Sequence, residues 1–452
     1  MGRVSVALTS DSCSSSNLGM DSNRTPLSRA RSIWLINLFF GPGLAPTGVL
    51  LESLAMDLHL HGWHVEVLAG TADYRAVENR ESSCFPGIVH RFHCQSKQPG
   101  TRGKFWTWLW FYVQVAWFAL WRRMPDVILV QTTPPFLHTI FTLRCLFTWR
   151  RRELILWNQD TYPETLIATR ILREKSLAYR CLNWIAHWSG RRITRAVALD
   201  GAMAERLGRQ GIKNVRIIPN WDVSPVSSRT DLLEVQSNPR QLDALPDNDA
   251  DSRSLPTELT SAAIGYRYRI AYTGNLGIGH DLTPLWNFIA QHPTQSDFLF
   301  LFVGEGDRTR ELKSMIERNG WKCVKFWPYL PASQFDAFLN WADWGLVALE
   351  PNCLGLMSPS KLHAWLRAGK PVLYIGPEGS NVTETVRAYD CGFVADPQDP
   401  QSFEHVAEKI LKISFDSRQM GLRARQAWHE RHTSTVGLSA WRELLPPHDS
   451  SA

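Results

Sequence analysis

The sequence reads Tyr272-Thr273-Gly274-Asn275-Leu276-Gly277-Ile278-Gly279-His280-Asp281 between an apolar run, 269–273, and a helical pattern that begins near Leu282. A strand that breaks into glycines and continues as a helix leaves backbone N–H groups at the positive end of that helix, where phosphate groups bind. Strand-to-helix turns in any α/β domain also use glycine, so an ordinary turn explains this stretch equally well. The rest of the chain has to decide between the two readings.

Short apolar runs alternate with helical patterns along most of the chain, at the spacing of βαβ units. We expect strands near 33–39, 65–68, 88–92, 127–131, 154–157, 196–199 and 215–218, and again near 270–273, 298–303, 324–327, 344–348 and 372–375. The predicted fold class is α/β, with two Rossmann-like doubly wound domains that face a cleft. In such a protein the ligand lies outside the carboxyl ends of the strands.

The distribution of polar residues predicts the domain boundaries. Residues 1–30 are rich in Ser, Asn and Arg without an apolar core, which indicates a disordered lead-in and no secretory signal. Residues 224–263 are rich in Ser, Pro, Asp, Asn and Gln, as in a linker or surface insertion. We therefore expect a first domain at 31–222, a linker at 223–263, a second domain at 264–415, and C-terminal helices at 416–452 that pack back toward the first domain.

Composition excludes several classes of protein. The 452 residues are 44% hydrophobic and 20% charged, which suits two or three globular domains rather than a fibrous or disordered chain. The eight cysteines show no C-x-x-C spacing, and a chain of this length does not need disulfides to fold. A reduced, cytoplasmic compartment is the simpler interpretation.

Positive charge is concentrated in one segment. The formal net charge is only +6, but residues 91–195 hold 17 Lys and Arg against 5 Asp and Glu, a local balance of 17 − 5 = +12. Such a segment is expected to lie near an anionic partner. Nucleic acid is the competing partner, but no nucleic-acid-binding module is visible in the sequence, so we expect none.

Two strand ends in the first half carry candidate binding residues. Gly48 begins an amphipathic helix after the first strand, where a ligand can approach the backbone, although an ordinary βα turn explains it as well. Gln159, Asp160 and Tyr162 follow a run that should be buried, and amides and carboxylates of this kind suit acceptor hydroxyls. Asp160 could instead cap the following helix. Pro163 favours an extended conformation at Tyr162 and should direct this loop away from a helix.

Two further strand ends in the second half resemble phosphate-binding loops. Gly304 and Glu305 follow the strand at 298–303, and Asp307 after them is a candidate helix cap. Ser360 and Lys361 begin a helix. A lysine at this positive helix end is unfavourable by itself, but it is explained if a nucleotide diphosphate lies between it and the helix N–H groups.

Taken together, these residues resemble family 4 of the glycosyltransferases, within it the colanic-acid and exopolysaccharide type. The resemblance covers about residues 33–430. It rests on Ala45-Pro46-Thr47-Gly48, His61-Gly62-Trp63-His64-Val65, Thr133-Pro134-Pro135, Gln159-Asp160, Tyr162-Pro163-Glu164, Pro219-Asn220-Trp221, Gly274-Asn275-Leu276-Gly277, His280-Asp281, Val303-Gly304, Pro359-Ser360-Lys361 and Ala368-Gly369-Lys370-Pro371. Each motif is weak by itself, but their common order is specific.

The resemblance implies a GT-B architecture, with the nucleotide-sugar donor on the C-terminal domain and the acceptor on the N-terminal one. It also implies retention of anomeric configuration without a metal ion or other cofactor. The implied catalytic residues are Asp160, His280 and Lys361. The implied donor site for a UDP- or GDP-sugar comprises Gly48, Gly274, Asn275, His280, Gly304, Glu305, Ser360, Lys361 and Asn381. The implied acceptor site comprises Gln159, Asp160 and Tyr162.

The chain departs from the family pattern on the donor side. Many members carry two glutamates eight residues apart where this chain has Leu356 and Ala364, and an arginine and a lysine where it has Asn275 and His280. Asn381 stands where relatives often have a glutamate, and Glu350 is the nearest acidic substitute. Two alternatives stay open: a nucleotide-sugar epimerase of the same fold, and a catalytically silent subunit of a polysaccharide assembly complex.

A tryptophan-rich segment, 105–121, predicts contact with a membrane surface. Only Thr107 and Gln114 clearly interrupt it, and at 1.5 Å per residue a helix over these residues is about 26 Å long, short for a bilayer core of about 30 Å. Burial within the first domain is the competing reading, and one face could pack while the other meets lipid. The expected membrane contacts are Trp106, Trp108, Trp110, Trp117, Arg122 and Arg123, with Arg144, Arg150, Arg151, Arg152, Arg191, Arg192 and Arg195 as a nearby basic surface. We therefore expect an enzyme on the inner face of the cell membrane that acts on a lipid-linked or oligosaccharide acceptor.

Overall fold

The computed structural model describes residues 31–41, 45–71, 85–94, 101–148, 152–222, 255–277, 279–306, 308–412 and 417–446, without the side chains at 101, 102, 104 and 332. Among the expectations, the lead-in at 1–30, most of the linker, Asp307, Arg150 and Arg151 lie outside these residues. The last part of the expected linker is structured, because helix α8 (Thr257–Ser261) packs Leu259 into the core of the second domain.

The first domain is built on a seven-stranded parallel sheet in the order β3-β2-β1-β4-β5-β6-β7. Its strands are β1 (Ser32–Ile36), β2 (His64–Gly70), β3 (Ile88–Phe92), β4 (Val127–Gln131), β5 (Glu153–Trp157), β6 (Arg195–Ala198) and β7 (Val215–Ile217). Its helices are α1 (Pro46–Leu60), α2 (Thr101–Trp121), α3 (His138–Leu146), α4 (Glu164–Ala168), α5 (Leu177–Gly190) and α6 (Gly201–Arg209). All seven expected strands are present, within three residues of their expected bounds.

The second domain has a six-stranded parallel sheet in the order β10-β9-β8-β11-β12-β13. Its strands are β8 (Tyr268–Thr273), β9 (Phe298–Val303), β10 (Val324–Trp327), β11 (Trp344–Ala348), β12 (Val372–Ile375) and β13 (Gly392–Ala395). Its helices include α9 (Thr283–Gln291), α10 (Thr309–Asn319), α11 (Ala332–Trp341), α12 (Lys361–Arg367), α13 (Asn381–Tyr389) and α14 (Ser402–Lys412). Sequence reasoning missed β13, because it begins with Gly392, a residue type that is depleted in strands, and leaves only a short apolar run.

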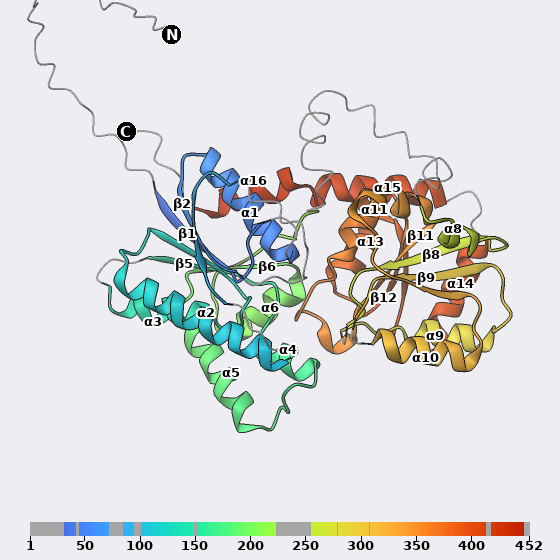
Figure 1. Cartoon of the computed structure of the whole chain (residues 1–452), viewed down its shortest axis with the longest axis horizontal. Helices are drawn as coiled ribbons and strands as arrows, with labels where there is room; N and C mark the ends of the chain where they lie inside the picture. The colour runs from blue at the N-terminus through green and yellow to red at the C-terminus, as the bar shows by residue number, and fades with distance from the viewer. Residues whose placement is uncertain are drawn as a thin grey trace, which may run out of the picture.

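Alternate residues of each strand enter cores on the two faces of each sheet, as a parallel sheet covered on both sides requires. In β1, Ile33 and Leu35 pack with α1, whereas Trp34 and Ile36 pack with α2 and α3. The two doubly wound sheets lie side by side as separate lobes (Figure 1). The predicted fold class is confirmed.

The C-terminal helices connect the two lobes. Helix α15 (Ser417–Arg431) packs on α12 and α13, and α16 (Ser434–Leu444) then crosses to α1 of the first domain (Figure 1). Trp441 of α16 is fully buried against Trp157 of β5, with ring centroids 4.8 Å apart, and Trp157 stacks on Trp221 at 5.7 Å. Burial of each large apolar side chain contributes about 1.5–3 kcal/mol, so this tryptophan cluster fixes α16 to the first domain.

Candidate functional site

The glycine-rich stretch follows β8, and β9 ends beside it. Gly304 has a φ of 135°, and a Cβ atom there would lie 2.3 Å from the carbonyl oxygen of Gly274. A Cβ at Gly306 would lie 2.4 Å from the carbonyl oxygen of Leu276. Both positions therefore require glycine, because the two loops touch backbone to backbone. The contact holds the loop after β8 open toward solvent, with Asn275 and Glu305 exposed.

Lys361, the first residue of α12, points at this loop. Its Nζ lies 3.1 Å from Nε2 of His280 and 4.9 Å from the ring centroid of Tyr272. Nδ1 of His280 lies 3.3 Å from the carbonyl oxygen of Gly277, so Nδ1 carries the proton and Nε2 accepts from the ammonium group. His280, Lys361 and the loop of Gly274 thus form one group, which we call the donor-side cluster.

Burial sets the charge of this cluster. Burial lowers the pKa of Lys361 to about 8. Burial, with the positive charge of Lys361 in addition, lowers the pKa of His280 to about 3, so the imidazole is neutral at physiological pH. In the part of the chain that the structure describes, the Lys361 ammonium group therefore has only this neutral imidazole as a hydrogen-bond acceptor. An ammonium group in this position favours an anion that brings it a full counter-charge.

The polar cluster after β5 lies at the facing edge of the first domain. The Thr132 hydroxyl oxygen accepts from the backbone N–H groups of Gln159, at 3.0 Å, and Asp160, at 3.1 Å. The side-chain amide of Gln159 exchanges two hydrogen bonds with Asn220, at 2.8 and 3.3 Å. The Asp160 side chain does not cap α4, whose N-cap residue is Pro163, and burial raises the pKa of Asp160 to about 6. The carboxyl group is therefore available for chemistry.

Tyr162 is partly buried beside this edge, and burial, together with the negative charge of Asp160, raises the pKa of its hydroxyl group. Its ring lies 6.4 Å from that of Phe136, and it lines a cavity of about 10 Å³ inside the first domain, large enough for about one water molecule. The Tyr162–Pro163 peptide bond is cis, and α4 begins directly at Glu164. The expectation that Pro163 directs the loop away from a helix was therefore wrong, because a proline can precede the first turn of a helix.

Direct contacts join the two domains at these loops. The backbone N–H of Thr161 donates to the carbonyl oxygen of Leu356 at 2.8 Å. The Thr161 hydroxyl donates to the carbonyl oxygen of Gly355 at 3.1 Å. Burial, with the negative charges of Glu350 and Asp160 in addition, raises the pKa of Cys353 to about 12. Asp160 of the first domain and Glu350 of the second therefore face the same buried thiol.

The other expected donor residues lie at varied places. Gly48 is buried, and a Cβ there would lie 3.1 Å from the backbone of Phe39 and Phe40, so the residue lets α1 pack against the end of the first strand. Ser360 is exposed at the start of α12 and its side chain makes no capping bond. Asn381 is buried at the start of α13, where its backbone N–H reaches the Asp200 carboxylate of the first domain. Its Oδ1 has no hydrogen-bond partner among the described residues.

Sequence reasoning missed several residues of the site. Tyr272 lies under Lys361 and donates its hydroxyl to the carbonyl oxygen of Asn275 at 2.9 Å. Arg308 donates to the carbonyl oxygen of His280 at 3.1 Å. Thr132 and Asn220 hold the acceptor-side loop. Of these two, only Asn220 was indicated by the sequence, as part of the motif Pro219-Asn220-Trp221. Within the described residues, no three His, Cys, Asp or Glu side chains gather closely enough to hold a metal ion.

Comparisons with known proteins agree with this fold. Residues 47–221 match the model of the glycosyl transferase 4-like domain. The probable glycosyltransferase WbjE of Pseudomonas aeruginosa is 22% identical over 331 residues, which cover 72% of this chain and 75% of the relative. Sucrose-phosphate synthase from Thermosynechococcus elongatus has a similar structure, with a TM-score of 0.64 and 15% identity over 92% of this chain and 99% of that one.

Two further solved structures share the fold. Anabaena Alr3699/HepE in complex with UDP gives a TM-score of 0.61 and 15% identity, over 92% of this chain and 99% of that one. WaaG, a glycosyltransferase involved in lipopolysaccharide biosynthesis, gives a TM-score of 0.59 and 14% identity, over 92% of this chain and 100% of that one. The fold thus defines the class: this chain has the GT-B fold. It is, more particularly, a glycosyltransferase, and its residues 47–221 are similar to the glycosyl transferase 4-like domain.

Proposed function

We propose that the enzyme transfers a sugar, with retention of configuration and without a metal ion, from a UDP- or GDP-sugar to a lipid-linked acceptor in the synthesis of a surface polysaccharide. The single observation that carries the donor half is Lys361, whose partly buried ammonium group has, among the described residues, only the neutral His280 imidazole as its hydrogen-bond acceptor. HepE, of the same fold, binds UDP and UDP-glucose. A diphosphate beside Lys361 would receive both this charge and the backbone N–H groups of the glycine-rich loop.

The acceptor half rests on Asp160. An acceptor hydroxyl between the two domains would meet the Asp160 carboxyl, whose pKa of about 6 suits it to receive a proton near neutral pH. The leaving diphosphate would stay with Lys361 and the glycine-rich loop while the sugar moves to the acceptor. Thr161 ties this loop to Gly355 and Leu356 of the donor domain, so the two substrates would be held in one fixed geometry.

A thermal-shift series with UDP, GDP, ADP and inorganic phosphate tests the donor half. A ligand that binds only the native state raises the melting temperature, so one nucleoside diphosphate should shift it by several degrees and phosphate should not. Lys361→Met should abolish the shift, whereas the exposed Lys325→Met should keep it. Equal shifts in all three proteins would remove the donor site from Lys361. With a radiolabelled donor, transfer to a lipid-linked acceptor distinguishes a transferase from an epimerase or a silent subunit.

The lipid-linked acceptor is supported by an exposed apolar surface on the first domain. Helix α2 contacts α3, and α3 contacts α5. Large apolar side chains that are more than a third exposed lie along these helices: Phe105, Trp106, Leu109, Trp110, Val113, Trp117, Leu120, Trp121, Leu143, Leu146, Phe147, Leu177 and Trp184. We call these residues the apolar surface. Patches of this size on soluble proteins mark sites of interaction with a partner or a membrane.

Helix α2 divides into two faces. Phe111, Val115 and Ala119 are buried in the first domain, and Trp108 packs on the same core. Trp108 is partly exposed, whereas Trp106, Trp110 and Trp117 are exposed. No helix among the described residues is long and apolar enough to cross a bilayer.

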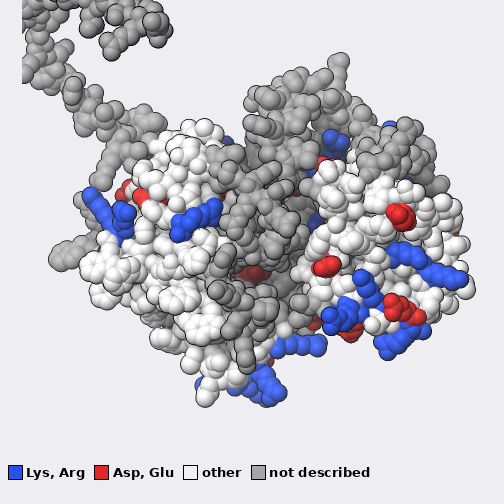
Figure 2. All heavy atoms as spheres, viewed as in Figure 1, with Lys and Arg blue, Asp and Glu red and all other residues white. Residues whose placement is uncertain are grey.

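Basic side chains surround the apolar surface. Arg122, Arg123, Arg180, Arg191 and Arg192 are exposed. In the view of Figure 2, the first lobe is largely uncharged over its lower part, with Lys and Arg at its borders. Not every expected arginine contributes, because Arg195 pairs with Glu153 and with the carbonyl oxygen of Leu444. Aromatic and basic residues in this arrangement suit the interface of an anionic bilayer.

A further inference from the structure

A second cavity lies in the first domain, at the end of the sheet opposite to the acceptor-side loop after β5. Its volume is about 240 Å³, and its lining includes Ser32, Trp34, Glu66, Arg122, Arg123 and Arg152. Ser32 is the first residue of β1, and Arg152 immediately precedes β5. The cavity therefore opens at the amino ends of the strands, whereas the site described above follows their carboxyl ends. It cannot be part of the donor or acceptor site.

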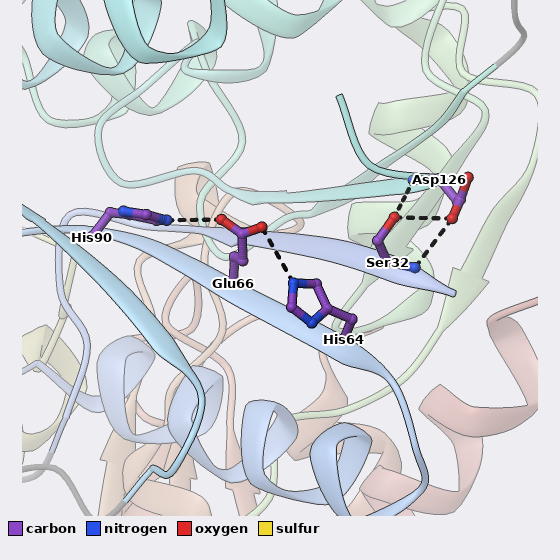
Figure 3. Close-up of polar contacts among 5 residues, drawn as sticks. All are labelled: Ser32, His64, Glu66, His90 and Asp126. Atoms are coloured by element: carbon purple, nitrogen blue, oxygen red, sulfur yellow. Dashed lines mark hydrogen bonds and ion pairs between the residues drawn. The ribbon is translucent and has the colours of Figure 1, made fainter. Parts of the chain in front are cut away.

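The carboxylates of this cavity are already engaged. Asp126 accepts from the backbone N–H of Ser32 at 3.1 Å, from its hydroxyl at 2.9 Å, and from Arg152 Nη1 at 3.1 Å. Glu66 accepts from His90 Nε2 at 2.8 Å, and His64 Nε2 lies 3.5 Å from its other oxygen (Figure 3). Each acid is thus held by neighbours on the strands, which leaves the arginines to set the charge toward an incoming ligand.

The arginines have unused hydrogen-bonding capacity. Neither Arg122 nor Arg123 has an ion-pair partner among the described residues, and the Arg122 guanidinium lies 5.5 Å from the ring centroid of Phe118. The side chain of Arg152 is 12% exposed, and its buried Nε has no hydrogen-bond partner there. Guanidinium groups present paired N–H donors that match the oxygens of a phosphate.

The charge of the lining selects a singly charged ligand. Three arginines against Asp126 and Glu66 leave a balance of 3 − 2 = +1 when the histidines are neutral. A phosphodiester carries one negative charge and four oxygens. A nucleoside diphosphate carries more charge, and the two carboxylates would repel it. The cavity therefore fits a phosphodiester better than a second nucleotide.

The position of the cavity identifies the source of that phosphodiester. Arg122 and Arg123 directly follow Trp121, the last residue of α2, and the exposed rings of Trp117 and Trp121 lie 5.6 Å apart at this end of the apolar surface. We propose that the cavity binds the phosphodiester headgroup of an anionic membrane lipid, whose chains run along the tryptophans of α2. This assignment rests on the membrane docking proposed above and gives it a specific recognition site.

The test uses a substitution that keeps the charge and removes the guanidinium geometry. Sedimentation is measured with vesicles of phosphatidylcholine alone and of phosphatidylcholine mixed with phosphatidylglycerol, for the wild type and for the double variant Arg122→Lys, Arg123→Lys. The matched control is Arg310→Lys, Arg318→Lys on the exposed side of the second domain. We expect about tenfold weaker binding of the Arg122/Arg123 variant to the anionic vesicles, since lysine cannot form the paired bonds, and unchanged binding of the control. Melting temperatures verify that each variant is folded.

The outcomes separate the cavity from the membrane docking itself. Undiminished binding of the Arg122/Arg123 variant, together with release of a variant that lacks the exposed tryptophans, would overturn the headgroup site and leave the docking in place. Absence of vesicle binding by the wild type would overturn both, without touching the nucleotide shift that tests the donor site. A thermal shift with inorganic phosphate that the lysine variant loses, without any change in vesicle binding, would make the cavity a free-phosphate site and overturn the lipid assignment.

Discussion

Lys361 Nζ and His280 Nε2 lie 3.1 Å apart, although the two residues are 81 positions apart in the chain. The pair brings the start of α12 onto the loop after β8, and burial keeps the imidazole neutral. The ammonium group therefore has a hydrogen-bond partner but no counter-charge from that partner. The first two predictions rest on this pair.

Replacing Lys361 should separate catalysis from folding. Lys361→Met removes a cation that burial already disfavours, so the melting temperature should stay the same or rise. Sugar transfer should fall by about a hundredfold or more, because the leaving diphosphate loses its charge stabilisation. Turnover and melting temperature are measured together, with Lys325→Met as the exposed control. Transfer at the wild-type rate would exclude Lys361 from the site.

Binding of the donor should take up protons near pH 8. The pKa of Lys361 is about 8 without ligand, so the side chain is about half protonated at that pH, and a diphosphate raises the pKa by favouring the charged form. Calorimetry with the nucleotide in buffers of different ionisation enthalpy should show uptake of up to about half a proton at pH 8. The uptake should be much smaller at pH 6.5, where the lysine is already charged. Equal uptake in Lys361→Met would assign the proton to another group.

Asp160 should control turnover but not donor affinity. Asp160→Asn keeps the shape of the side chain and removes the proton acceptor, so turnover should fall by roughly 10²–10⁴ while the nucleotide affinity stays unchanged. In the wild type, turnover should decrease as the pH falls through about 6, because the carboxyl group becomes protonated and can no longer accept the proton of the hydroxyl. A pH profile of transfer, with the nucleotide thermal shift recorded in parallel, decides this prediction.

The contact between the domains is tested by two glycines with similar backbones. Gly355 has a φ of 69° and Gly379 a φ of 76°. A Cβ at Gly355 would lie 2.7 Å from the carbonyl oxygen of Ala202 in the first domain, whereas a Cβ at Gly379 meets nothing within 4 Å. Both alanine variants should lose about 1–2 kcal/mol to the left-handed backbone. Gly355→Ala should also lose turnover, because Gly355 holds Thr161 beside Asp160. Equal turnover in the two variants would contradict a role for this contact.

Membrane docking should depend on the exposed tryptophans. The triple variant Trp106→Ser, Trp110→Ser, Trp117→Ser should be released from anionic vesicles, since interfacial binding scales with the apolar area that is buried. The control replaces Leu60 and Ile264, which are 75% and 80% exposed but lie outside the apolar surface, with serine. Sedimentation of the tryptophan variant equal to that of the control would show that α2 faces another partner.

Part of the site could be predicted from the sequence. Gly274 and Gly304 directly follow strands that their apolar runs predict, and Lys361 begins a predicted helix. A parallel sheet brings the loops after its strands to one edge. Tyr162 and Trp108, expected at the acceptor site and at the membrane, are each partly buried: the ring of Tyr162 lies beside Phe136, and Trp108 packs on the core that holds Phe111. Their residue types fit either environment, and the direction of a single side chain depends on the neighbours that surround it.

The sequence alone determined the two α/β domains, because apolar runs of four to seven residues and the helical patterns between them are local properties of the chain. The tertiary structure alone decided which distant residues meet. Three examples join segments whose proximity no local sequence pattern indicates. The Thr132 hydroxyl accepts from the backbone after β5, Thr161 bonds to Gly355, and one cavity is lined by both Arg122 and Arg152. Their charge states follow from burial, and burial exists only once the chain has folded around these groups.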